Sequence, residues 1–148
     1  MSLVEQLDTD FKQALKSRDA EKLSVLRLVR SSIKNFEIEK HGIASDEDVV
    51  AILGREIKQH RESVEANEKA ERPEEVRRLQ EEIGFLSLYL PPQLSSDELK
   101  DVVVAALAET GAESLEDVGK VMGHVMPQVR GRASGDEVGR QVRELLGQ

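Results

Sequence analysis

The sequence contains no cysteine and no tryptophan, and its aromatic residues are limited to three phenylalanines and one tyrosine. Without cysteine, disulfides, thiolate metal sites, iron–sulfur clusters and cysteine nucleophiles are all excluded. With so few aromatic rings, stacking of exposed bases on aromatic side chains is not expected. The sequence therefore disfavours proteins that depend on sulfur chemistry or on a base-stacking surface.

Long apolar runs and an excess of positive charge are also lacking. No stretch approaches the ~18 apolar residues of a membrane-spanning helix, and the N-terminus shows no basic segment followed by an apolar one. We therefore expect a cytoplasmic protein with no membrane partner. The 148 residues carry 21 basic and 29 acidic side chains, for a net charge of -8. Phosphate is repelled overall, so nucleic acid would have to bind at a local basic patch.

Catalytic motifs are absent as well. The histidines, His41, His60 and His124, form no H-x-x-x-H pair, and His60 lies on an apolar stripe where a structural role is expected. There is no G-x-S-x-G sequence, and Gly119-Lys120 lacks both the upstream glycine and the following Ser or Thr of a Walker loop. We therefore predict no catalytic residues, no metal site and no cofactor.

What the sequence does contain is helical periodicity along almost its whole length. Four apolar stripes precede residue 91, and the last two are joined at Arg72-Pro73, which predicts an antiparallel helical hairpin with alternating charges outside. The stripes consist of Leu3, Leu7, Phe11 and Leu15; Leu26, Val29, Ile33 and Phe36; Val50, Leu53, Ile57, His60 and Val64; and Val76, Leu79, Ile83, Leu86 and Leu90.

Pro91-Pro92 is the strongest helix breaker and predicts a domain boundary. Three short helices are expected after it, beginning at the capping residues Ser95, Ser114 and Ser134, the second of them ending at Pro127. No alternating strand pattern of useful length occurs. The predicted fold is all-α, with an N-terminal helical domain over residues 1–92 that contains the long hairpin. A small three-helix domain is expected over residues 93–148.

One basic patch is predicted on the second helix. Arg27, Arg30 and Lys34 fall within an arc of about 60°, on a side distinct from the apolar stripe. An ordinary solvated helix face also produces such a pattern, so these three residues are the weaker candidates for binding an anion.

The segment from residue 117 to residue 135 carries the main candidates. Gly119 and Gly123 share one helical face and cost roughly 1 kcal/mol each relative to Ala, which indicates close approach by a neighbouring helix or by an external ligand. Arg130 and Arg132 flank Gly131 just before a helix N-terminus, an arrangement that suits phosphate. Asp136 and Glu137 in the first turn of that helix oppose an anion, so a simply capped helix is the alternative. Candidates around this segment are Gly119, Lys120, Gly123, Arg130, Gly131 and Arg132, with Arg140 and Arg143 as weaker additions.

These residues also carry a family resemblance. The segment D-V-G-K-V-M-G-H-V-M-P-Q-V-R-G-R-A-S-G resembles the C-terminal signature of YqeY-like proteins, which are similar to the tail domain of GatB, a subunit of the aspartyl/glutamyl-tRNA amidotransferase. Further matching blocks are L-R-L-V-R-S-S-I-K-N-F-E-I-E-K (26–40), R-E-I-K-Q-H-R-E-S (55–63) and Y-L-P-P-Q-L-S-S-D-E-L (89–99). Two positions depart from the pattern: Ser134 where Asp is expected, and Gln128 where Lys is common.

The resemblance implies a helical protein that binds tRNA or assists glutamine-dependent tRNA amidation without catalysis of its own. Two alternatives stay open. The first is a helical protein–protein interaction module that docks on a tRNA amidotransferase or another translation component. The second is an amidotransferase-related enzyme, a carbon–nitrogen ligase with glutamine as amido donor, which the lack of a catalytic constellation disfavours.

Overall fold

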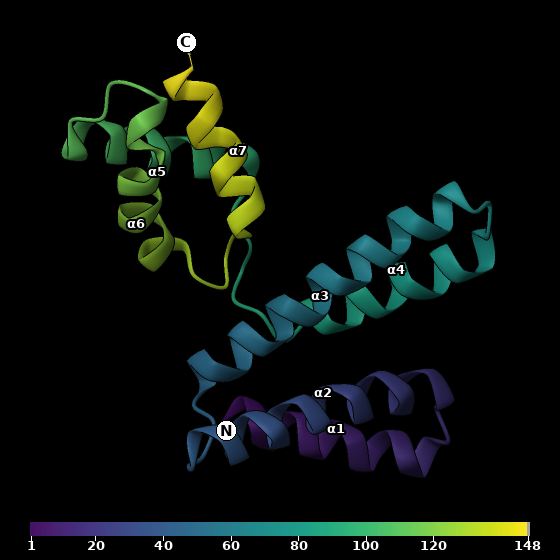
Figure 1. The fold of residues 1–148 in the computed structure, drawn as a ribbon. Coiled ribbons are helices and arrows are strands. Elements are labelled where there is room, and N and C mark those ends of the chain that lie inside the picture. The colour runs from purple at the N-terminus through teal and green to yellow at the C-terminus, as the bar shows by residue number, and fades with distance from the viewer. Residues whose placement is uncertain (148) are drawn as a thin grey trace. The chain divides into compact units, whose positions relative to one another are not determined.

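The computed structural model describes residues 1–147, and it confirms the all-α prediction for this part of the chain, which contains no strand. Figure 1 shows the helices as two groups, which correspond to two compact units, Met1–Leu90 and Pro91–Gln148. That residues 1–92 and residues 93–148 form two separate domains stays a prediction. The elements are α1 (Leu3–Ser17), α2 (Ala20–Lys40), α3 (Asp46–Lys69), α4 (Pro73–Ser87), α5 (Ser96–Thr110), the 3-10 turn η1 (Leu115–Asp117), α6 (Val118–Val129) and α7 (Gly135–Leu146).

Capping side chains explain where most helices begin. The hydroxyl of Ser2, Ser45 or Ser95 accepts the N–H of the third residue of the helix, and an acidic side chain at that position returns a bond to the serine N–H. Asp19 caps α2, and Pro73 starts α4 as its first residue, where a missing N–H costs nothing. The local sequence thus sets the boundaries that were predicted from it.

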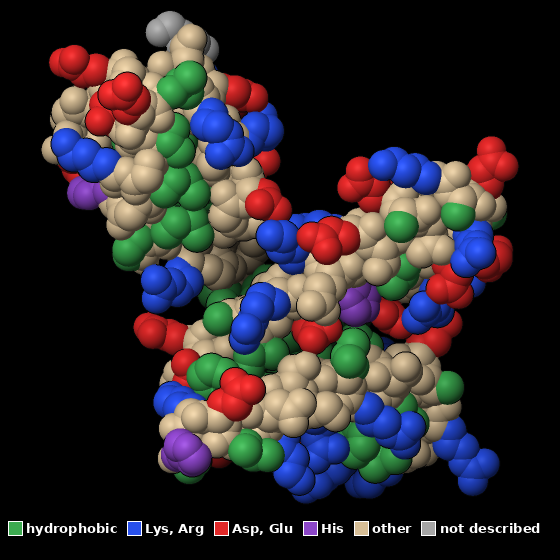
Figure 2. All heavy atoms as spheres, in the orientation of Figure 1, with side chains coloured by type: hydrophobic (Ala, Val, Ile, Leu, Met, Phe, Trp, Pro, Cys, Tyr) green, Lys and Arg blue, Asp and Glu red, His purple; other side chains and the backbone are tan. Residues whose placement is uncertain are grey.

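In the first unit, α1 pairs with α2, and α3 pairs with α4 as the predicted hairpin (Figure 1). The two pairs enclose one aliphatic core, in which Leu7, Leu26, Leu53 and Leu86 are at most 1% exposed. Red and blue side chains alternate along the outer hairpin surface in Figure 2, as the charge pattern predicted. Four glutamates of α4, for example, form ion pairs with Arg77 and Arg78.

One prediction for α1 is wrong. Leu15 is 46% exposed, and Ala14 is buried in its place. A four-residue step turns the helix about 40° beyond a full revolution, so after three such steps Leu15 lies about 120° from Leu3. Seven residues make almost two whole turns, and Ala14 therefore stays on the same face as Leu7.

In the second unit, α5, α6 and α7 pack around a core that is rich in valine. Val103, Val121, Val125, Val138 and Val142 are all fully buried. The helix α5 ends at Gly111, which has the left-handed φ of 68° that often ends a helix.

Two details of the second unit differ from expectation. Pro127 does not end its helix, because α6 continues to Val129, which is 1% exposed in the core. The proline deprives only the carbonyl of Gly123 of its helical partner, and that residue faces solvent. Ser134 caps α7 as predicted by accepting the N–H of Glu137, but the reciprocal bond of a full capping box is replaced, because the Glu137 carboxylate pairs with Arg140.

Candidate nucleic-acid interface

The candidate glycines lie on the side of α6 that faces away from the core. Val121 and Val125 are buried, whereas Gly119 and Gly123 are exposed on the opposite side of the helix. An added Cβ atom on either glycine would have no neighbouring atom within 4 Å. Close packing against a neighbouring helix is therefore not the reason for these glycines among residues 1–147, and of the two explanations drawn from the sequence only the external ligand stays open.

Two cations lie at the ends of this glycine face. Lys120 follows Gly119 at the start of α6, and Arg130 is the residue that ends the helix. Both are exposed, and neither forms a hydrogen bond or ion pair with the rest of the described chain. They are about 15 Å apart along the axis, given a rise of ~1.5 Å per residue. We call Gly119, Lys120, Gly123 and Arg130 the α6 outer face.

One acidic residue, Asp117, lies close enough to Lys120 for their charges to interact. The pKa of Asp117 is held below its usual value, first by hydrogen bonds from the N–H groups of Glu113 and Ser114 and to a smaller degree by Lys120. Asp117 thus serves mainly as the cap of the turn before α6. The ammonium group of Lys120 keeps its donors available to a ligand.

Gly131 and Arg132, which were predicted to contact phosphate, are engaged within their own unit. Gly131 has a φ of 78°, and its carbonyl accepts a 2.7 Å hydrogen bond from the Gln93 side chain. Arg132 donates from Nε to the Pro92 carbonyl at 3.0 Å, and the Arg132 carbonyl accepts the N–H of Leu94 at 2.9 Å. These bonds fix the segment of residues 92–94 to the turn after α6. The structure therefore gives Arg132 a structural role that the sequence did not reveal.

The weaker candidates on α7 differ from each other. Arg140 pairs with Glu137 and Glu144, and the first of these pairs is the largest cause of the lowered pKa of Glu137. Arg143 is exposed and forms no ion pair within residues 1–147, and its guanidinium lies above Gly139, 3.1 Å from the position of an added Cβ. Only Arg143 therefore adds an available positive charge.

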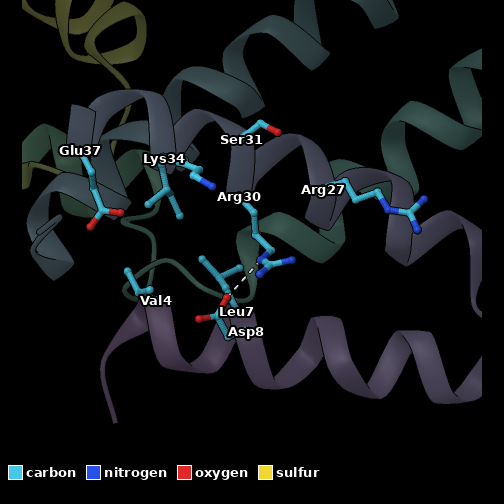
Figure 3. Close-up of a pocket in the computed structure, with 9 residues that line it drawn as sticks. Val4, Leu7, Asp8, Arg27, Arg30, Ser31, Lys34 and Glu37 are labelled. Carbon is cyan, nitrogen blue, oxygen red and sulfur yellow. Dashed lines mark hydrogen bonds and ion pairs between the residues drawn. The ribbon is translucent and has the colours of Figure 1, made fainter. Parts of the chain in front are cut away.

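On the first unit, Arg27, Arg30 and Lys34 line one groove between α1 and α2, with a volume of about 490 Å³. Figure 3 shows Arg30 directed at Asp8 and Arg27 directed away along α2. The Nε atom of Arg30 is 3.1 Å from Asp8 Oδ1, and its guanidinium lies 4.1 Å from the centre of the Phe11 ring. Arg30 is thus already neutralised, while Arg27 and Lys34 have no such partner among the described residues.

The structural role expected for His60 is confirmed, but sequence reasoning missed the partners with which it forms a polar cluster inside the hairpin. His60 and Glu82, which are 7% and 9% exposed, meet with Nε2 and Oε2 2.7 Å apart. The other oxygen of Glu82 accepts a 2.8 Å hydrogen bond from Arg78, and His60 Nδ1 is 2.8 Å from the carbonyl of Glu56. One signal was available: Glu82 follows Leu79 by three residues, on the apolar stripe that faces the stripe of His60.

The described residues contain no group of three or more His, Cys, Asp or Glu side chains that could hold a metal ion. Within residues 1–147, no helix combines the length and the apolar character required to cross a membrane.

Residues 1–147 thus form a helical protein without strands, and its second unit exposes a glycine face between two cations. The chain belongs to the YqeY-like family, because the family model described as "Yqey-like protein" matches residues 4–146. It is also similar to the Altered inheritance of mitochondria protein 41, mitochondrial, of Pyrenophora tritici-repentis (strain Pt-1C-BFP). That similarity is 28% identity over 145 residues, which cover 96% of this chain and 80% of the relative.

Proposed function

We propose that this protein binds tRNA through the α6 outer face and assists glutamine-dependent tRNA amidation without catalysing it. The observation that carries the proposal is the pair of exposed glycines between two available cations on one helix. The resemblance of residues 117–135 to the amidotransferase tail supports tRNA as the particular nucleic acid.

Glycine suits this role because it lets a polymer backbone come close to the helix. With no side chain at Gly119 or Gly123, a sugar–phosphate backbone approaches the α6 surface directly. Lys120 and Arg130 then contact separate phosphates, since about 15 Å between them is too far for a single group. Such contacts recognise the shape and backbone of a folded RNA rather than its bases.

The net charge of -8 sets the expected strength of this contact. Few cations are available on the second unit, because Arg132 and Arg140 are engaged with their own neighbours. The affinity for tRNA is therefore modest and falls steeply with salt. Arg27 and Lys34 on α2 remain secondary candidates for further phosphate contacts.

The test is tRNA binding by fluorescence anisotropy across a salt series, for the wild type and for Lys120→Gln/Arg130→Gln. Loss of two phosphate contacts weakens binding and makes the slope of log affinity against log salt shallower by roughly two units. The matched control is Arg55→Gln/Arg61→Gln, which removes two exposed cations of α3 and leaves both quantities near their wild-type values.

Equal slopes for the wild type and for Lys120→Gln/Arg130→Gln would reject the α6 outer face as the RNA contact. Failure of the wild type to bind tRNA would reject the RNA function and favour the protein-docking alternative. Glutamine-dependent amidation of a mischarged tRNA by the purified chain alone would overturn the non-catalytic part of the proposal.

A further inference from the structure

A second hollow in the first unit lies between the N-terminal half of α2 and the α3–α4 hairpin. Its volume is about 570 Å³, within the usual range of small-molecule sites, ~300–1,000 Å³. The α2 helix and the hairpin diverge toward the loop that joins α3 to α4 (Figure 1). The hollow is lined by residues of three helices, namely Ser24, Val25, Arg27, Leu28, Ser31, His60, Arg78, Leu79 and Glu82.

The α2 wall presents polar groups that nothing else in the described chain uses. Ser24, Arg27 and Ser31 are spaced three and four residues apart, so they form one row along the helix. All three are exposed, and none forms a hydrogen bond or ion pair among residues 1–147. The guanidinium only donates hydrogen bonds, and the hydroxyl groups on either side of it can donate or accept them. Such a row of groups suits a carboxylate or phosphate.

The opposite wall contains the buried polar cluster. The Nδ1 atom of His60 faces the Glu56 carbonyl, which only accepts hydrogen bonds, so this nitrogen carries a proton. The Nε2 atom lies 2.7 Å from Glu82 Oε2, and the other oxygen of that carboxylate accepts a hydrogen bond from Arg78. Arg78 is paired with both Glu75 and Glu82, so Arg27 is the cation of the hollow that has no carboxylate partner among residues 1–147.

Apolar surface lies beside the polar groups. Val25 and Leu79 are 3% and 7% exposed, whereas Leu28 is 46% exposed although it lines the same hollow. A ligand with an apolar body would cover the exposed leucine and gain free energy from its burial. A concave site with apolar walls and a few convergent polar groups is the usual form of a small-molecule site.

We propose that this hollow binds a small organic anion. Its carboxylate or phosphate group lies against Arg27, with hydrogen bonds from Ser24 and Ser31, and its apolar body packs on Leu28 and Leu79. The anion balances the positive charge of Arg27, which forms no ion pair within the described part of the chain. This proposal does not depend on tRNA binding by the α6 outer face, which lies on the other unit; the one residue it shares with the candidates for RNA contact is Arg27.

The experiment uses phenyl phosphate as the probe, titrated into the full chain labelled with ¹⁵N, and benzyl alcohol as its uncharged counterpart. NMR chemical shifts report on the amides of Ser24 and Ser31 and on the imidazole of His60. Phenyl phosphate is expected to shift these signals to saturation, and benzyl alcohol is expected to bind at least about tenfold more weakly, because it lacks the charged hydrogen bonds.

Arg27→Gln tests the charged contact and leaves the core untouched, since this side chain is exposed. The substitution is expected to reduce the affinity for phenyl phosphate by at least about tenfold, whereas Arg55→Gln, an exposed arginine outside the hollow, leaves it unchanged. Inorganic phosphate and benzoate, titrated in parallel, show whether the site prefers one acidic group.

Three results would overturn the proposal. The first is no saturable shift at Ser24, Ser31 or His60 with any of the anions. The second is equal affinity for the wild type and Arg27→Gln, which would place the binding elsewhere. The third is displacement of phenyl phosphate by tRNA together with an equal loss of tRNA affinity in Arg27→Gln, because the hollow would then be part of an RNA surface rather than a small-molecule site.

Discussion

The phenol of Tyr89 donates a hydrogen bond to the carboxylate of Asp10, 79 residues earlier in the chain, and so joins the end of the hairpin to α1. Tyr89 is 9% exposed, and its ring packs edge-on against Phe85 with the ring centres 5.6 Å apart. Burial, and then the bond to Asp10, raise the pKa of Tyr89 above its usual value.

The raised pKa of Tyr89 predicts a loss of stability in alkali. The neutral phenol contributes its full stability below the unfolded pKa of about 10, and this contribution is lost as the pH rises above that value. Because the chain has one tyrosine and no tryptophan, absorbance near 295 nm follows this group alone. Tyr89 of the folded protein is expected to ionise at higher pH than in denaturant, and Asp10→Asn to reduce the difference. Identical titrations in the two states would contradict the buried hydrogen bond.

The pair of His60 and Glu82 predicts strong coupling in the free energy of unfolding. Glu82→Leu alone is expected to cost about 3 kcal/mol, because it leaves His60 without its buried acceptor. The double variant His60→Leu/Glu82→Leu is expected to cost much less than the sum of the two single variants, since it leaves neither partner unpaired. Denaturant unfolding measures all three. The exposed control Glu81→Leu changes the free energy of unfolding by at most about 0.5 kcal/mol. If the costs of His60→Leu and Glu82→Leu simply add in the double variant, the pairing is refuted.

The capping carboxylates predict a loss of stability in acid. The ammonium of Lys40, and then the N–H of Ser45, hold the pKa of Asp48 below its usual range, and the N–H of Ser95 does the same for Glu98. Each charge stabilises the fold above its unfolded pKa of about 4, and the effect is lost as the pH falls through the lower folded value. The Tm is therefore expected to fall as the pH is lowered from about 5 to about 3, and to fall less in Asp48→Asn. An unchanged Tm over that interval would rule out these caps.

The open glycine face of α6 predicts a gain in stability on substitution. Gly119→Ala/Gly123→Ala is expected to raise the free energy of unfolding by about 1–2 kcal/mol in total, since Ala is the better helix former and its Cβ meets no neighbour. Gly54→Ala/Gly84→Ala, at equally open helical positions of the first unit, should stabilise to a similar degree. Denaturant unfolding of both pairs checks this. Destabilisation at 119 or 123 would show that the face is packed.

Local rules predicted the helix starts, because a capping serine or aspartate acts within one turn of its own helix. These rules failed at positions where tertiary packing determines how far a helix extends or which of its residues are buried. Pro127 suggested an end to its helix, but burial of Val129 holds the last turn in place. The misplacement of Leu15 came from following a four-residue spacing over too long a stretch.

The sequence predicted which residues form the candidate site, but not which of them are available to bind a ligand. The sequence identified Arg130 and Arg132 as equivalent cations and Arg140 as a weaker addition. It holds no information on which of them is engaged with Pro92 or with α7 glutamates. Nor does it show whether Gly119 faces a helix or solvent. Both depend on how distant segments pack within the unit.

The most direct test of the central claim, that a tRNA backbone lies against the α6 outer face, is the tRNA affinity of Gly119→Gln/Gly123→Gln. The two added side chains are neutral and point into open space, so folding and net charge are preserved, but they keep a backbone away from α6. The account predicts at least about a tenfold loss of affinity, which is ~1.4 kcal/mol of binding free energy, and no loss for Gly54→Gln/Gly84→Gln. Wild-type affinity in the α6 variant would contradict it.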